Sequence, residues 1–457
     1  MCVFLSRWLQ YESLGLLEGK KKENVFSFIF FYFYWNRNGM TLPRRPYEAL
    51  RGHFEKCLAT PLRPMNLRTL AGNDKGYIHT AVEQLGARTA RSYRAIYSEV
   101  QKRSLDREIN ARLSPLESIC RREFECCVEL SELAEVYLRK MERGEICDAD
   151  TSQPNEIIDD AQVDSIMKGE GYGGSGNSGG DSSVKLLIDV LESLRPHENL
   201  FDIVVNEEWI CSPNFNNWLS RFCTRRVSWR VIHEHLLHLV GPGRYSPIIR
   251  TDPNVGSILR HTGTVVVEQY VRSIQSIHGG SMFIHMEEQP DLFTRVPSGR
   301  LATSSKVDCP IFPTTSMPPA PSSRVIYSVE GHLEYVFREL MKNACLAMRS
   351  RTNSIELQVC FASNDTHVVV DVTDAAGGIA PDAVEKLWLF GWTTNSSFDN
   401  KMGGFGIGLP ASKCYMDLWG GRIDLYTTEG VGTTVRVIFP KAPTEVFVPK
   451  GTPSSFD

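Results

Sequence analysis

The sequence predicts a helical bundle followed by an α/β sandwich, and two observations carry this prediction. From about residue 60 to 280, apolar residues recur at helical spacing, with long periodic runs over 113–141 and 218–240. From about residue 325 to 440, alternating strand patterns surround two helical segments and several glycine-rich turns. A chain of 457 residues, 42% of them hydrophobic, is long enough for two sizeable cores.

Composition excludes several classes of protein. The chain carries 50 basic and 54 acidic side chains, and its net charge of −4 gives no bulk attraction to nucleic acid. Its 12 cysteines form no Cys-x-x-Cys motif, which is typical of free thiols in a reducing compartment. The apolar stretch 25–35 has 11 residues, fewer than the roughly 20 that a membrane-spanning helix needs. We therefore expect no nucleic acid partner and no membrane span.

The N-terminal stretch leaves two starts open. Met1 is the first residue, whereas Met40 begins the basic segment Met-Thr-Leu-Pro-Arg-Arg-Pro, which is compatible with import into an organelle. The apolar stretch before Met40 is then either an interfacial anchor or translated sequence upstream of the true start.

The most informative motif is Glu339-Leu-Met-Lys-Asn343. Glu339 and Asn343 are four residues apart and share one face of a predicted helix, with Lys342 on the same side. An apolar stripe on the opposite side should pack against a sheet: Leu333, Val336, Phe337, Leu340, Ala344, Ala347 and Met348. An Asn amide oxygen can bind Mg²⁺, and a carboxylate beside it can orient or deprotonate a nucleophile. Taken alone, the motif is more readily explained by an amphipathic surface helix with solvated charges.

A predicted hairpin follows and ends in a carboxylate. Residues 355–361 alternate, a turn spans 363–366, and the strand 368–372 leads into Asp374. An aspartate at a strand end can accept a hydrogen bond from an exocyclic amine, while Gly377 and Gly378 let a flat base approach the backbone. A plain strand-terminating turn is the alternative.

The third motif is the glycine-rich segment 403–408, which precedes a predicted helix that stops at Gly420-Gly421. Backbone amides at such a helix start face phosphate oxygens, and the helix dipole favours negative charge there. A further turn follows at Gly432-Thr433. One glycine-rich turn is weak evidence, but the three in this order indicate an ATP site without a P-loop.

Residues 325–440 resemble the GHKL (Bergerat) ATP-binding domain shared by gyrase, the ninety-kilodalton heat-shock chaperone, histidine kinases and MutL. The Glu339/Asn343 motif is similar to its N box, and Thr393, Thr394 and residues 395–403 resemble its lid. The resemblance implies ATP and Mg²⁺ as cofactors, Glu339 as catalytic residue and Asn343 as metal ligand. It implies nucleotide contacts from Glu339, Lys342, Asn343, Leu346, Asp374, Gly378, Thr393, Thr394, Gly404, Phe405, Gly406, Ile407, Gly408, Leu409 and Thr433.

Further segments narrow the resemblance to the mitochondrial 2-oxo acid dehydrogenase kinases. They are 53–56, 61–68, 219–230 and 252–255, together with the form of the N box and Gly408-Leu-Pro410. This resemblance implies a four-helix bundle before the GHKL sandwich, and a serine kinase of the mitochondrial matrix acting on pyruvate or branched-chain dehydrogenase. Its implied partners are the E1 alpha subunit, the lipoyl domain of the E2 core and a second copy of the chain, with K⁺ as a further cofactor.

The expected domains follow. They are an N-terminal extension or targeting segment at 1–45, a helical bundle at 46–285 with a Gly/Ser-rich insertion at about 168–183, a linker at 286–324, the kinase domain at 325–442 and a tail at 443–457.

Three positions depart from the family pattern. Ala376 stands where a glycine is usual and should slightly crowd the base site, and Leu346 replaces an arginine on the phosphate side. Tyr335 is typical of branched-chain-type members, whereas pyruvate-type members usually have histidine there. The choice between the two substrates stays open, as does the effect of Ala376 and Leu346 on catalysis.

Two other functions remain open. A histidine-kinase-like enzyme would autophosphorylate on His233 or His235, although bundle histidines more often pack or cap. A regulatory module would bind ATP without catalysis, and Ala376 and Leu346 keep that alternative alive. A zincin-like zinc site at His233 is excluded because position 237 is leucine. The basic stripe Arg221, Arg225, Arg226 and Arg230 is either a solvated face or a site for an acidic partner.

Overall fold

The structure is a computed structural model. It describes residues 47–102, 107–143, 182–194, 213–241, 244–252, 255–278, 281–295, 297, 300–301, 325–329, 331–349, 354–393 and 406–447. The chain divides into two compact units, Met1–Gly52 and His53–Asp457, and apart from the first residues of α3, which include Gly52, all that follows concerns the second. The expected N-terminal extension 1–45, the insertion up to residue 181 and most of the expected linker and tail lie outside the described residues.

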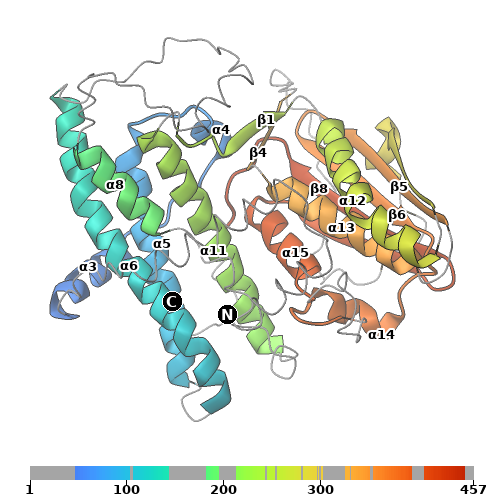
Figure 1. Ribbon diagram of the computed structural model, residues 1–457, viewed down its shortest axis with the longest axis horizontal. Helices are drawn as coiled ribbons and strands as arrows, with labels where there is room; N and C mark the ends of the chain where they lie inside the picture. The colour runs from blue at the N-terminus through green and yellow to red at the C-terminus, as the bar shows by residue number, and fades with distance from the viewer. Residues whose placement is uncertain are drawn as a thin grey trace, which may run out of the picture. The chain divides into compact units, whose positions relative to one another are not determined.

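The first part of the second unit is helical (Figure 1). Its helices are α3 (Tyr47–Ala59, begun in the first unit), α4 (Leu67–Leu70), α5 (Tyr77–Lys102), α6 (Arg107–Glu142), α8 (Ser182–Ser193) and α11 (Pro213–Val240). Helix α5 packs on α6 and α11, and α8 packs on α6 and α11. The fully buried Leu85, Leu130, Leu191 and Trp229 form part of their common core. The two periodic runs predicted as helices lie within α6 and α11, so this prediction is confirmed.

A six-stranded sheet forms the second part. Its strands, in spatial order, are β2 (Ser281–Glu288), β5 (Ser354–Ser363), β6 (His367–Asp374), β8 (Gly432–Pro440), β7 (Arg422–Thr428) and β3 (Arg300–Leu301). Strand β2 is parallel to β5 and every other neighbouring pair is antiparallel. The predicted hairpin is present as β5 and β6, and the Asn364 side chain closes its turn by accepting from the amides of Thr366 and His367.

Three helices cover one face of this sheet: α12 (Val255–His278), α13 (His332–Arg349) and α15 (Gly408–Leu418) (Figure 1). Short turns of helix, α14 (Pro381–Val384) and η2 (Glu385–Trp388), follow β6. The apolar stripe predicted on α13 is buried among these elements, except for the exposed Ala347. On the other face, η1 (Pro290–Phe293) covers a smaller apolar cluster around Cys360 and Val369.

The structure does not have the boundary between helical bundle and linker that was expected at residue 285. Helix α12 was expected in the bundle, but it packs against α13 and the sheet. Residues 281–288 are a strand because Ile284 and Met286 alternate toward the sandwich core, and β3 adds a second strand within the expected linker. A further pair, β1 (Ile249–Asp252) and β4 (Ile326–Val329), forms a separate antiparallel ribbon.

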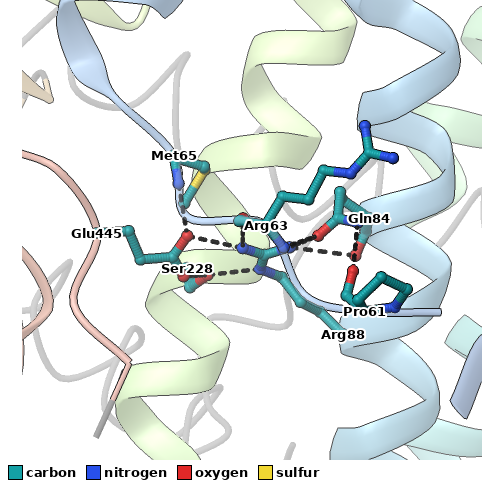
Figure 2. Close-up of polar contacts among 7 residues, drawn as sticks. All are labelled: Pro61, Arg63, Met65, Gln84, Arg88, Ser228 and Glu445. Carbon is teal, nitrogen blue, oxygen red and sulfur yellow. Dashed lines mark hydrogen bonds and ion pairs between the residues drawn. The ribbon is translucent and has the colours of Figure 1, made fainter. Parts of the chain in front are cut away.

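The segment that follows β8 connects the sandwich to the helical part. Its backbone pairs with the chain before α4, where Glu445 N donates to Met65 O at 2.7 Å and Leu67 N donates to Pro443 O at 3.1 Å. The buried Glu445 carboxylate accepts from Arg88 Nη2 at 2.6 Å, from Ser228 Oγ at 2.5 Å and from the Met65 amide at 3.0 Å (Figure 2). The start of the expected tail is therefore an ordered connection to α5 and α11.

Three expectations about cysteines, metals and membranes concern the described part of the chain. The eight cysteines described there are free thiols, as expected. No group of three or more His, Cys, Asp or Glu side chains in this part could hold a metal ion. None of its helices is both long enough and apolar enough to cross a bilayer.

Candidate functional site

Helix α13 carries the first set of predicted site residues. Its apolar stripe fixes the helix on the sheet, so Glu339, Lys342 and Asn343 lie together on another side of the helix. The Glu339 and Lys342 side chains form an ion pair, with only 11% and 13% of their surfaces exposed. Asn343 and Leu346 are half-buried on the following turn. The ammonium group of Lys342, predicted to contact nucleotide, is thus engaged by Glu339.

The Glu339 carboxylate also lies against the first residue of α15. A Cβ atom built on Gly408 would overlap the Oε2 atom of Glu339 and would lie 3.1 Å from its Cδ atom. The residue before the helix, Ile407, supplies no side-chain cap. The structure therefore brings the N-box carboxylate to a helix N-terminus, which favours negative charge.

Asp374 ends strand β6, opposite Thr433 on β8. Its Oδ1 atom accepts from the Ala376 amide at 2.8 Å, and the backbone of Thr433 also hydrogen-bonds the carboxylate. Burial raises the pKa of Asp374, and these hydrogen bonds act in the opposite direction. Burial, together with the charge of Asp374, raises the pKa of Cys345 on α13 to about 12. Strand β6, which ends at Asp374, packs on α13, the helix that carries Glu339 and Asn343.

The loop after Asp374 depends on two glycines. Gly377 and Gly378 have φ of 84° and 73°, a region that other residues rarely adopt. A Cβ on Gly378 would overlap the carbonyl oxygen of Thr428, the last residue of β7. Ala376 lacks a positive φ, and its buried side chain belongs to the sandwich core. Alanine is therefore compatible with the backbone at this position.

The sequence analysis did not predict that Thr427 on β7 supports this loop. Thr427 Oγ1 accepts from the Ile379 amide at 2.9 Å and lies 3.1 Å from Thr433 Oγ1. No motif singles out this residue, because threonine is common in strands. The one signal was its position in the alternation of β7, in phase with the buried Ile423 and Leu425.

The segments on either side of the predicted lid meet at a pair of glycines, Gly391 and Gly406. Gly391 N donates to Gly406 O at 3.0 Å, and a Cβ on Gly406, whose φ is 68°, would lie 2.5 Å from the Gly391 carbonyl carbon. Ile407 and Leu409 are half-buried, and Thr393 is exposed. The remaining predicted contacts here, Thr394, Gly404 and Phe405, lie outside the described residues.

The histidine-kinase-like alternative and the basic stripe both depend on side chains that are buried or paired in the structure. His233 is fully buried and its Nε2 atom lies 2.7 Å from Leu191 O, while His235 is 1% exposed. Arg226 forms a bidentate pair with Glu123, at 2.6 and 2.7 Å, and Arg230 pairs with Glu234. Neither histidine is open to a phosphate donor, and these two arginines of the basic stripe have acidic partners within the chain.

The region that carries this site is similar to known proteins. Residues 328–443 match the family of histidine kinase-, DNA gyrase B- and HSP90-like ATPases. These residues are thus similar to the ATPase domains of this family. The matched region contains α13, β5, β6, α15, β7 and β8, the elements that carry the candidate site, and a match to such ATPases implies ATP binding.

Curated relatives that match about half of the chain agree with the narrower resemblance. The chain is similar to mitochondrial pyruvate dehydrogenase (acetyl-transferring) kinase 1 of Saccharomyces cerevisiae, with 23% identity over 55% of this chain and 62% of that protein. Isozymes 1 and 4 of the same kinase from Homo sapiens are 27% and 23% identical, each over 51% of this chain and over 50% and 53% of their own lengths. The resemblance to this kinase family is thus confirmed, although the chain spans little more than half the length of these relatives.

One group of solved structures is also similar. The catalytic domain of the histidine kinase ThkA matches 42% of this chain and 97% of its own, with 16% identity and a TM-score of 0.28.

Proposed function

We propose that this protein is an ATP-dependent protein serine kinase that phosphorylates, and thereby inactivates, the E1 component of a mitochondrial 2-oxo acid dehydrogenase complex. The names of its relatives and its GHKL-type domain support this proposal. The observation that carries it is the position of the Glu339 carboxylate, beside Lys342 and against the first residue of α15.

Glu339 is the general base of the proposed reaction. It takes the proton of a substrate serine hydroxyl while the hydroxyl oxygen bonds to the γ-phosphorus of ATP. The bond from that phosphorus to the bridging β–γ oxygen breaks, and ADP leaves with the electron pair. Such transfer depends on positioning and on neutralising charge. In this proposal Asp374 reads the adenine amine, and residues 404–409 with Thr433 bind the phosphates.

Asn343 is the proposed ligand of Mg²⁺. Its amide oxygen belongs to the donor type that this ion prefers, and it lies one helical turn from Glu339 on α13. Bound there, Mg²⁺ would neutralise phosphate charge. Lys342 and Leu346 flank this ligand, Thr393 and Thr394 line the lid, and K⁺ remains a second cofactor by resemblance alone.

The proposal extends to the domain architecture, the partners and the location of the protein. Helices α5, α6, α8 and α11 form the four-helix bundle, and the kinase domain spans about 325–442. The E1 alpha subunit is the substrate, the lipoyl domain of the E2 core is the docking partner, and the enzyme is a homodimer. The location is the mitochondrial matrix, in line with the compartment that its relatives' names carry.

Radiolabelled ATP tests this proposal against the two alternatives. Purified protein is incubated with pyruvate and branched-chain dehydrogenase E1, and the labelled residue is identified. We expect acid-stable phosphoserine on one E1, and no label on E1 from the Glu339→Gln variant, which should keep its ADP affinity. Acid-labile label on this chain would instead identify a histidine-kinase-like enzyme, and ATP binding without label would identify a regulatory module. Transfer retained by Glu339→Gln would remove Glu339 from the role of base.

A further inference from the structure

Gly408 occupies the first position of α15, where its backbone does not require glycine. Its φ is not among the positive values found at Gly377, Gly378 and Gly406. Glycine also weakens a helix relative to alanine, because it loses more conformational freedom on folding. A structural reason for glycine at position 408 is found in what surrounds it.

The side chain of Glu339 supplies that reason. A Cβ on Gly408 would overlap its Oε2 atom, and would lie 3.1 Å from Cδ and 3.4 Å from Cγ; no other residue supplies one of the three nearest atoms. By contrast, a Cβ on Gly378 or Gly406 would meet backbone atoms of other segments. Among these glycines of the site, Gly408 is the one whose missing side chain makes room for the carboxylate.

Glu339 can yield to a larger neighbour only by turning its carboxylate, because the helix that carries it is fixed. Its side chain is 11% exposed and is held by the ion pair with Lys342 from the same helix. Helix α13 itself is fixed because Val336, Phe337 and Leu340 are buried in the sandwich core. A side chain at position 408 would therefore turn the carboxylate away from the start of α15 rather than displace the helix.

The geometry points to Gly408 as a positioning residue for Glu339. This inference rests on the proposed function, since it assigns Gly408 to the orientation of the base in addition to the phosphate contact expected of a glycine-rich loop. Space at position 408 lets α13 and α15 meet with the carboxylate between them. The carboxylate is thereby directed to the helix start where transfer would take place.

The kinetic test is the Gly408→Ala variant. We expect its kcat for E1 phosphorylation to fall at least tenfold, while KM for ATP and the Kd for ADP stay within about threefold of wild type. Glu339→Asp should impair the wild-type enzyme but restore part of the activity of Gly408→Ala, because the shorter side chain withdraws from the added methyl group. Gly52→Ala is the matched control, since a Cβ on this helical glycine meets nothing within 4 Å.

Two outcomes of this test would overturn the inference. A loss of ADP affinity equal to the loss of kcat would mean that Gly408 acts on the phosphates alone. Additive effects of Gly408→Ala and Glu339→Asp on kcat would mean that the two residues act independently.

A double-mutant cycle measured by Tm tests the contact between Gly408 and Glu339 independently of kinase activity. Gly408→Ala should lower the Tm of the wild-type chain but raise that of Glu339→Ala, where the obstacle is gone and alanine favours the helix. If wild-type protein phosphorylated no E1, the kinase proposal would fail while this cycle could still be measured. Equal Tm changes in both backgrounds would refute the contact between Gly408 and Glu339 itself.

Discussion

Two carboxylates of the site illustrate how single residues acquire different tasks. Asp374 accepts hydrogen bonds from the backbone of its own loop and of Thr433, which hold it in one orientation. Glu339 instead pairs with a side chain, Lys342, and borders Gly408. A carboxylate held by backbone suits the recognition of a fixed group such as an adenine amine. A carboxylate held by a flexible lysine can change partner during a reaction, as a base must.

Asn343 is the proposed metal ligand, so its removal should affect nucleotide binding. Asn343→Ala should weaken the binding of Mg²⁺-ADP at least tenfold, because it removes the proposed protein oxygen ligand of the metal ion. Calorimetric titration with ADP measures this affinity, and a parallel titration in EDTA is the internal control, in which variant and wild type should agree. Unchanged affinity in the presence of Mg²⁺ would count against Asn343 as metal ligand.

Two buried histidines predict how stability changes with pH. Burial and the charge of His238 lower the pKa of His235 to about 4, while burial and Arg230 lower that of His332 to about 3. Both therefore remain neutral in the folded chain, while in the unfolded chain they take up protons below the ordinary histidine pKa of 6.5. Their contribution to stability is fully present above pH 6.5 and is lost as pH falls toward 4 and 3.

His235→Phe tests this pH dependence. His235 has no hydrogen-bond partner within the described part of the chain, so its removal leaves no polar group unpaired. The variant should lose less stability than wild type between pH 6.5 and 4, by about 3 kcal/mol if the full pKa change applies. Urea unfolding at several pH values measures the difference. Parallel curves for the two proteins would show that His235 does not titrate as expected.

Among the elements, the loop between β6 and α14 meets the turn between β7 and β8. Gly377 N donates to Val431 O, and Gly430 N donates to Gly377 O at 2.9 Å. The two segments are thus joined through backbone groups, which leaves no room for a side chain at Gly378. The nucleotide loop depends on this packing as well as on its own sequence.

A pair of glycine variants separates packing from backbone conformation. Gly378→Ala should lower ADP affinity at least tenfold, because it combines a φ of 73° with overlap of the Thr428 carbonyl oxygen. Gly430→Ala is the matched control, since its φ is 80° but a Cβ there meets nothing within 4 Å. It should cost only the strain of a positive φ, about 1 kcal/mol of stability. Equal losses of ADP affinity in both variants would mean that φ alone matters.

The sequence predicted elements whose pattern is local and missed those defined by a distant partner. The hairpin β5–β6 and the helices α13 and α15 have their own periodicity and turn residues, so they were predicted within a few residues. Strand β2 is recognised only through its pairing with β5, and β1 only through β4, many residues further along the chain. Alternation over eight residues or fewer does not distinguish such strands from a linker.

The site divides in the same way. Glu339, Asn343 and Asp374 could be named because their residue types and spacing indicate a chemistry. The contact of Gly408 with Glu339, and the support from Thr427, could not be predicted, because they depend on how α13, α15 and β7 meet in space. Arg88 and Glu445 lie in no motif at all, and their pairing joins positions 357 residues apart.

In the molecule as a whole, buried contacts tie the helical region to the region that carries the six-stranded sheet. Trp419 and Leu418, at the end of α15, belong to the same apolar core as Trp229 of α11. Phe390 is buried in another core with Phe215, and its amide donates to Asn216 Oδ1 at 2.8 Å. Arg88 and Glu445 add an ion pair with 3% and 2% exposure (Figure 2). The two regions should therefore lose their structure together.

Breaking the Arg88–Glu445 pair tests this coupling. Glu445→Gln leaves the guanidinium of Arg88 buried without its counter-charge, which should cost about 3–5 kcal/mol of stability. Arg88→Met combined with Glu445→Gln should recover part of this loss, because no charge then remains unpaired.

Arg139→Met, in an exposed pair with Glu135 at 67% and 57% exposure, is the control and should cost less than about 1 kcal/mol. Urea unfolding followed by tryptophan fluorescence measures all four proteins. A Glu445→Gln chain that unfolds at the wild-type urea concentration would show that the pair contributes nothing, and that the apolar cores alone join the two regions.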